Sequence, residues 1–217
     1  MNKRDVFYLV LTVIVIGVFA SSLYLQTVVY KYVDVLVRYM ETYRIFGIAI
    51  VVFGATLSSM LAPFTIAPIL LPPAIVTHGA FITFLYFLSG WVLGGIISFY
   101  ISRLWGRPAL ERLRLAHKVD YYEKLVPREH HFFVLLLFRL AMPSEIPGYI
   151  LGLTNIGFLR YFWATLLAEI PIGLILVYAG GAFVEKEFIT LAVLVGLAVF
   201  ITVTTFLIFI HRTKRQN

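Results

Sequence analysis

The chain contains no cysteine and few charged residues, and both shortages narrow the class of protein. Without cysteine among its 217 residues it can form neither disulfides nor thiolate metal sites, and it has no thiol nucleophile. Only 13% of the residues are charged and 61% are hydrophobic, with a mean hydropathy of +0.93. Soluble domains carry about 25% charged residues. We therefore predict an all-α polytopic membrane protein. We explain its formal charge of +7 by basic residues in cytoplasmic loops and not by binding of nucleic acid.

Sequence features of enzymes are also missing. The chain has no nucleophile and base pair, no cluster of metal ligands and no glycine-rich phosphate loop at a credible spacing. The histidine and arginine constellation of a lipid phosphatase, the nearest enzymatic alternative, is absent as well. We therefore expect neither catalysis nor a cofactor.

What the sequence does contain is an arginine inside an apolar run. Residues 132–142 are apolar except for Arg139, and Pro143 and Pro147 break the run before it resumes to Leu153. These eleven residues reach only about 16 Å as a helix, roughly half the hydrocarbon core of a bilayer. An arginine at mid-membrane costs at least about 2.5–3.5 kcal/mol, so it persists where it faces water, a counter-charge or a ligand. The segment is thus predicted to be a re-entrant hairpin that carries a functional charge.

Basic residues indicate the side of the membrane on which each loop lies, because cytoplasmic loops are enriched in lysine and arginine. They cluster near both termini, in residues 103–128 and at Arg160, and these positions are predicted to be cytoplasmic. If residues 45–61 crossed the membrane, the basic loop would lie on the wrong side. A hairpin that turns through Pro63 and Pro68 removes this conflict.

The resulting prediction is one membrane domain, residues 1–217, with about four full transmembrane helices and two opposed re-entrant helical hairpins arranged as an inverted repeat. Its parts are a first span (1–29), an external amphipathic helix (30–44), the first hairpin (45–79), a span (80–102), a cytoplasmic basic segment (103–131), the second hairpin (132–157), a span (158–181), the last span (188–210) and a cytoplasmic tail (211–217). Each half has prolines at its hairpin tip and a downstream glycine, Gly79 or Gly152. Both termini are predicted to be cytoplasmic and the membrane to be the plasma (inner) membrane.

Residues around the second hairpin also form a recognisable pattern. It consists of Phe133, Arg139, Pro143, Pro147, Tyr149, Gly152, Phe158, Phe162, Pro171, Tyr178 and Gly180. The pattern resembles the DedA family, also called the SNARE-associated or VTT-domain family, and within it a divergent vesicle-protein-like branch. The resemblance implies an integral membrane protein with two opposed re-entrant hairpins. It also implies action on lipid phosphates, which are polyprenyl-phosphate carriers in bacterial members and phospholipids in eukaryotic scramblases.

We expect the second hairpin to hold the substrate site. Arg139 is predicted to bind an anionic headgroup, because its planar guanidinium suits phosphate oxygens. Ser144, Glu145 and Tyr149 are further substrate-binding candidates, and Glu145 and Glu169 are candidate coupling groups for a proton or cation. The alternatives for Arg139 are a structural ion pair with Glu145 and hydrogen bonds to carbonyls freed at the hairpin tip. Glu169 is alternatively without a role in transport.

Prolines and one glycine are expected to shape the hairpins without touching the substrate: Pro63, Pro68, Pro143, Pro147 and Gly152. The predicted partners are membrane lipids with anionic phosphate headgroups, without nucleic acid or metal, and self-association is left open. The favoured function is movement of a phosphate-bearing lipid between leaflets by flipping or scrambling. The alternatives are a proton- or cation-coupled transporter of a small solute and a non-transporting membrane organiser whose hairpins serve only for packing.

Overall fold

The computed structural model describes residues 32–61, 66–112, 132–142 and 144–214, and within these ranges it contains helices and turns but no strand. Residues 32–42 form a helix that precedes α2 (Arg44–Met60), α3 (Ala67–His78) and α4 (Ala80–Arg112). The second half of the chain forms α6 (Phe132–Ala141), α7 (Glu145–Leu153), α8 (Phe158–Val184) and α9 (Phe188–Lys214). The predicted all-α class is confirmed.

Three of these helices are long and apolar enough to cross a membrane. They are Ala80–Gly106 of α4, the whole of α8, and Phe188–Thr205 of α9. The protein is therefore an integral membrane protein, as predicted. The expected first span, residues 1–29, lies outside the described residues.

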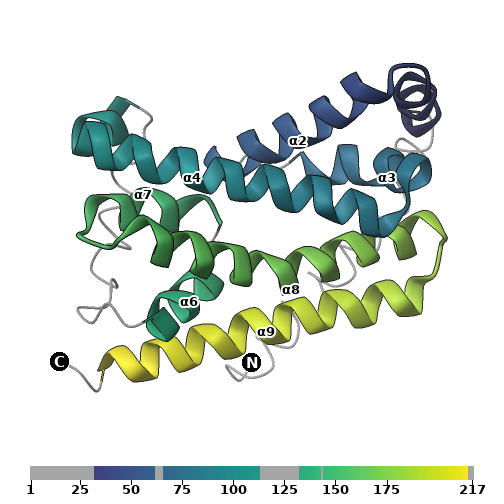
Figure 1. Cartoon of the computed structure of the whole chain (residues 1–217). Helices are drawn as coiled ribbons and strands as arrows, with labels where there is room; N and C mark the ends of the chain where they lie inside the picture. The colour runs from purple at the N-terminus through teal and green to yellow at the C-terminus, as the bar shows by residue number, and fades with distance from the viewer. Residues whose placement is uncertain (1–31, 62–65, 113–131, 143, 215–217) are drawn as a thin grey trace, which may run out of the picture.

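The other helices are shorter. Helices α2, α3, α6 and α7 contain 17, 12, 10 and 9 residues. At about 1.5 Å per residue they extend about 26, 18, 15 and 14 Å, against a hydrocarbon core of about 30 Å. Figure 1 shows α2 and α3 toward one end of the bundle and α6 toward the other.

The two breaks are placed differently relative to their prolines than the sequence suggested. Pro63 and Pro143 lie outside the described residues. Pro68 is in the first turn of α3, and Pro147 is the third residue of α7. The first turn of a helix donates no intrahelical hydrogen bond, so proline is tolerated there. The second break is consequently shorter than expected, because α7 begins at Glu145 and not after Pro147.

Glycines allow several of these helices to pack at close range. A Cβ on Gly94 of α4 would lie 2.5 Å from the Thr56 carbonyl of α2, and one on Gly152 of α7 would collide with the Phe99 carbonyl of α4. Gly152 thus lies inside a helix, whereas Gly79, its expected counterpart, ends α3 with a φ of +79°. The two glycines therefore serve different purposes: one permits a turn and the other permits contact between backbones.

Helix α4 bends near its end, where the sequence analysis had placed the start of the basic segment at residue 103. Gly106 has a φ of +62° and a ψ of −151°, which are not helical angles, so two helices meet at a kink there. A positive φ is readily adopted only by glycine. The first part of the predicted basic segment is therefore helical, but the kink at Gly106 separates residues 107–112 from the span.

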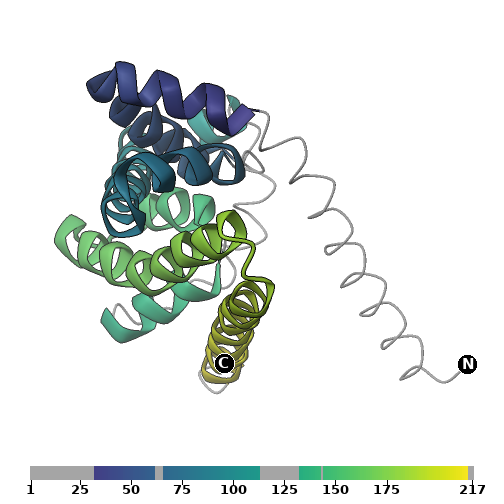
Figure 2. The ribbon, with the colours of Figure 1, turned by 90° about the vertical axis from the view of Figure 1, so that its right-hand side faces the viewer.

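Helix α9 lies at the edge of the bundle, where it packs against α8 and α6 (Figures 1 and 2). Helix α4 occupies the centre and contacts α2, α7 and α8. In the helix that precedes α2, Val33 and Met40 are buried and Leu36 and Val37 are half-buried. The apolar face predicted for residues 30–44 is thus the face that packs on the bundle.

Candidate functional site

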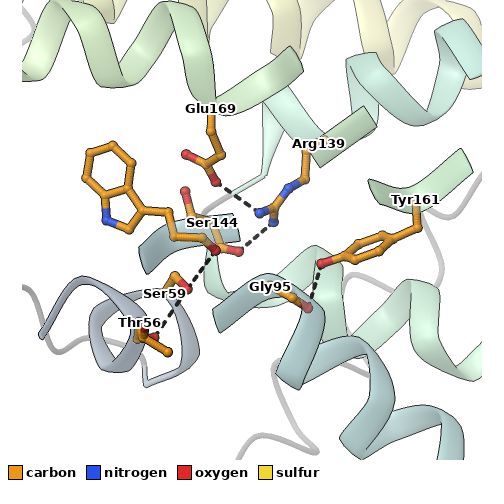
Figure 3. Close-up of polar contacts among 8 residues, drawn as sticks. Thr56, Ser59, Gly95, Arg139, Ser144, Tyr161 and Glu169 are labelled. Atoms are coloured by element: carbon orange, nitrogen blue, oxygen red, sulfur yellow. Dashed lines mark hydrogen bonds and ion pairs between the residues drawn. The ribbon is translucent and has the colours of Figure 1, made fainter. Parts of the chain in front are cut away.

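Arg139 lies in the last turn of α6 and points into the interior of the bundle. Its side chain is only 1% exposed. Nη2 donates a hydrogen bond to Glu169 Oε1 at 2.9 Å, and Nη1 donates one to the Ser144 carbonyl oxygen at 2.6 Å (Figure 3). One guanidinium therefore joins the end of α6 to the start of α7 and to the middle of α8.

The local sequence explains why the cation is placed there. Helix α6 is apolar apart from Arg139 and ends two residues later, so the positive charge lies at a helix C-terminus, where the backbone dipole favours it. Glu169 is the only acidic residue of α8 and lies within it, near Pro171. Both charged groups are thus carried on apolar helices and satisfy each other.

The ion-pair partner of Arg139 differs from the one considered in the sequence analysis. That analysis offered Glu145 as the structural partner, because it follows Arg139 closely in the chain. The carboxylate in contact is Glu169, thirty residues away, with a relative side-chain exposure of 7%. Glu145 is the first residue of α7, and its side chain lies outside the described part of the structure.

A partly open cavity of about 270 Å³ lies beside the ion pair. Its lining residues come from α6, the following break, α8 and α9: Arg139, Leu140, Ala141, Met142, Ser144, Ala168, Glu169, Ile172 and Thr202. A water molecule takes about 30 Å³ in the liquid, so the space can hold several waters or a small polar group. Three of the predicted site residues, Arg139, Ser144 and Glu169, line it together.

Arg139 keeps one donor without a protein acceptor. Its Nε is buried and makes no hydrogen bond within the described protein. Buried donors of this kind are almost always paired with a protein group, water or a ligand. The Nε hydrogen of Arg139 therefore has no acceptor among the described residues.

Tyr149, a predicted substrate-binding residue, joins α7 to the end of α2. It is 1% exposed, and its hydroxyl donates a hydrogen bond to the carbonyl of Met60, the last residue of α2, at 3.1 Å. The final carbonyls of a helix have no partner within it, so this contact satisfies one of them. Tyr149 is not among the residues that line the cavity.

The structure adds residues that sequence reasoning missed. Tyr161 of α8 is fully buried, and its hydroxyl donates to the Gly95 carbonyl at 2.8 Å. A Cβ on Gly95 would lie 2.9 Å from that hydroxyl and 3.5 Å from Arg139 Nη2, so this glycine leaves room for both groups. Tyr161 and Glu169 are eight residues apart, which places them on one face of a helix. That spacing was the available signal.

Arg103 holds α7 in place, although the sequence analysis counted it only as a topological charge. Its Nε donates to the Gly152 carbonyl at 2.9 Å and its Nη2 to the Ile156 carbonyl at 2.7 Å. Its guanidinium also lies 4.8 Å from the centre of the Phe99 ring. These contacts fix the end of α7 and the following residues against α4. Among the described residues, no group of histidine, aspartate and glutamate side chains could hold a metal ion.

A family model agrees with this architecture. The model of the VTT domain matches residues 63–182, which is more than half of the chain and contains Arg139, Tyr149 and Glu169. The protein therefore belongs to the VTT-domain family, the SNARE-associated or DedA domain. Its members are generally membrane proteins suggested to be transporters or to act on lipids, and the family is not a classical enzyme family. Comparison with curated proteins and with solved structures gave no match.

Proposed function

We propose that the protein moves a phosphate-bearing lipid between the leaflets of the plasma membrane by flipping or scrambling. The observation that carries this proposal is the cavity in which a buried arginine and a buried glutamate face each other. The headgroup would pass through this polar space while the acyl or prenyl chains stay in the bilayer.

Arg139 is the proposed phosphate-binding group. A guanidinium presents a planar set of donors that matches phosphate oxygens and keeps its charge. In the resting state Glu169 occupies part of this set, with Nε left over. An incoming phosphate would replace the carboxylate, and Ser144, whose carbonyl already accepts from Arg139, lies beside it.

Glu169 is the proposed coupling group. When a phosphate takes the guanidinium, the carboxylate loses its counter-charge inside a membrane protein, where an unpaired charge is costly. Uptake of a proton or a cation would remove that cost and would link the headgroup to an ion. Glu145, at the start of α7, is proposed as a second coupling group.

The proposed architecture is an inverted repeat of two re-entrant hairpins, α2 with α3 and α6 with α7. Four apolar helices of 9 to 17 residues support half-crossings. The pattern of contacts supports the repeat: each first arm packs on the long helix of its own half, α2 on α4 and α6 on α8. The second arms reach the long helix of the other half: α7 packs on α4, and α3 packs on both α8 and α4. Such repeats usually hold their substrate near the midplane.

Reconstitution tests the proposal. Vesicles that contain the protein receive a trace of labelled polyprenyl phosphate or labelled phospholipid, and movement between leaflets is measured. We expect Arg139→Gln, Glu169→Gln and Glu145→Gln to slow movement by at least about tenfold, since a single charged hydrogen bond is worth about 1.5–3 kcal/mol. Arg160→Gln, which removes an exposed arginine of α8, is the matched control and should retain wild-type rates.

Coupled transport of a small solute remains a second candidate because Glu169 is buried beside the cavity. The same vesicles separate the two functions. If an aqueous solute crosses and no labelled lipid changes leaflet, the solute transporter is correct. Wild-type lipid movement in Arg139→Gln, Glu169→Gln and Glu145→Gln would contradict the roles proposed for these residues.

A further inference from the structure

The cavity beside Arg139 reaches the surface of the molecule at α9. Thr202 lines the cavity together with Arg139 and Glu169, yet its own side chain is exposed. It follows Phe188, the first residue of α9, by 14 residues, or about 21 Å of helix. In a bilayer core of about 30 Å, a residue so far along a spanning helix lies within the hydrocarbon depth.

The face of α9 that carries Thr202 is apolar and exposed beside it, so the mouth of the cavity opens toward lipid and not toward bulk water. Val195 and Val199 precede Thr202 by seven and three residues on this face and are 47% and 57% exposed. Around Gly196 there is open space, since a Cβ placed there would meet no atom within 4 Å. Helix α9 rests on α8 and α6 and forms one wall of the cavity through Thr202.

Thr202 suits such a mouth chemically. Its hydroxyl donates to the Ala198 carbonyl within the same helix at 2.9 Å, so it carries no unsatisfied donor into the bilayer. The hydroxyl oxygen can still accept a hydrogen bond from water or from a headgroup. Its neighbour Val203 is 50% exposed and is not among the residues that line the cavity.

We propose that the opening beside Thr202 is a hydrated lateral portal through which a lipid headgroup passes between the bilayer and Arg139. The chains of the lipid would lie outside, along α9, while the headgroup reaches the ion pair. This inference rests on the proposed function, because it assigns the entry route to the same site. It adds α9 and Thr202, which lie outside the residues matched by the family model.

Single cysteines test whether the opening holds water, since the native chain has none. Thr202→Cys and Val203→Cys are treated in vesicles with a charged, membrane-impermeant thiol reagent. The thiolate is the reactive form and lipid disfavours it, so we expect Thr202→Cys to react at least about tenfold faster than Val203→Cys. Equal, slow labelling of both cysteines would overturn the portal, and this readout does not require transport.

Movement of a labelled phosphatidylethanolamine then tests whether the lipid uses the opening. Attachment of a bulky reagent to Thr202→Cys should slow movement by about tenfold or more, while the same reagent forced onto Val203→Cys should not, because only the former obstructs the route. Thr202→Trp and Val203→Trp repeat the comparison without labelling. Unchanged movement in blocked Thr202→Cys contradicts the portal alone, whereas an unmodified wild type that moves neither labelled phospholipid nor labelled polyprenyl phosphate contradicts the proposed function.

Discussion

Arg139 and Glu169 each provide the counter-charge of the other in a buried site. We therefore predict that removing one charge destabilises the protein more than removing both. Arg139→Gln removes the guanidinium counter-charge from the buried Glu169 carboxylate, and breaking a buried pair costs about 3–5 kcal/mol. The double variant Arg139→Gln with Glu169→Gln removes both charges, so most of the stability should return. Unfolding temperatures of the wild type, the single variants and the double variant, measured in detergent, test this prediction.

The same double variant separates a structural ion pair from a functional one. We expect its unfolding temperature to approach that of the wild type while lipid movement stays lost, because no cation remains to hold a phosphate. Recovery of both properties would show that the pair serves stability only. Arg160→Gln, in the first turn of α8, controls for the loss of one positive charge.

Tyr149 gives a second prediction at the residue scale. Tyr149→Phe keeps the ring but leaves the Met60 carbonyl without its donor, which costs about 1–3 kcal/mol when the group is buried. We expect a lower unfolding temperature with lipid movement per folded molecule retained. Tyr178→Phe, at a position 49% exposed, should change neither. A full loss of movement in a stably folded Tyr149→Phe protein would instead assign this hydroxyl to the substrate.

At the scale of helices, close contact between α2 and α4 depends on the absence of a side chain. Gly94→Ala would place a methyl group 2.5 Å from the Thr56 carbonyl, and overpacking of this kind costs about 1–3 kcal/mol. Gly196→Ala in α9 meets nothing within 4 Å, and there alanine should be neutral or stabilising by up to about 1 kcal/mol. The unfolding temperature should therefore fall in Gly94→Ala and should stay the same or rise in Gly196→Ala.

The short apolar helices could be predicted from the sequence, because apolar runs and prolines are local features of the chain. The length of each apolar run and the position of prolines predicted α6 and the interrupted pairs of short helices, and they singled out Arg139. The end points were less accurate: Pro147 was taken as part of a break, although a first helical turn accepts proline. Gly152 was matched to Gly79 by order alone, and order does not reveal which glycine turns the chain.

The partner of Arg139 could not be predicted, for a physical reason. Glu145 and Glu169 are both acidic residues in apolar surroundings, and the choice between them depends on how α6 packs against α8. No rule of spacing relates residues on separate helices thirty positions apart. The contact between Tyr149 and Met60, which are 89 positions apart, was hidden in the same way.

At the scale of the whole molecule, the turns at the two ends of α8 report the orientation of the protein in the membrane. Helix α8 separates two turns, one at Asn155 and one at Glu185, which must face opposite sides if α8 crosses. The distribution of basic residues predicts that Asn155 lies on the cytoplasmic side. In intact cells an impermeant thiol reagent should label Glu185→Cys and leave Asn155→Cys unlabelled until the cells are permeabilised. The reverse pattern would invert the proposed topology.

Helix α8 is also longer than the hydrocarbon core of a bilayer is thick. Its 27 residues extend about 40 Å against a hydrocarbon core of about 30 Å. Such hydrophobic mismatch is relieved by tilting, so a thicker bilayer should draw the helix more upright. Glu169 is carried by α8 and Arg139 by the much shorter α6, and a change of tilt would slide one charge past the other. The length of the lipid chains would thus change the distance between the two charges, without any change in the protein sequence.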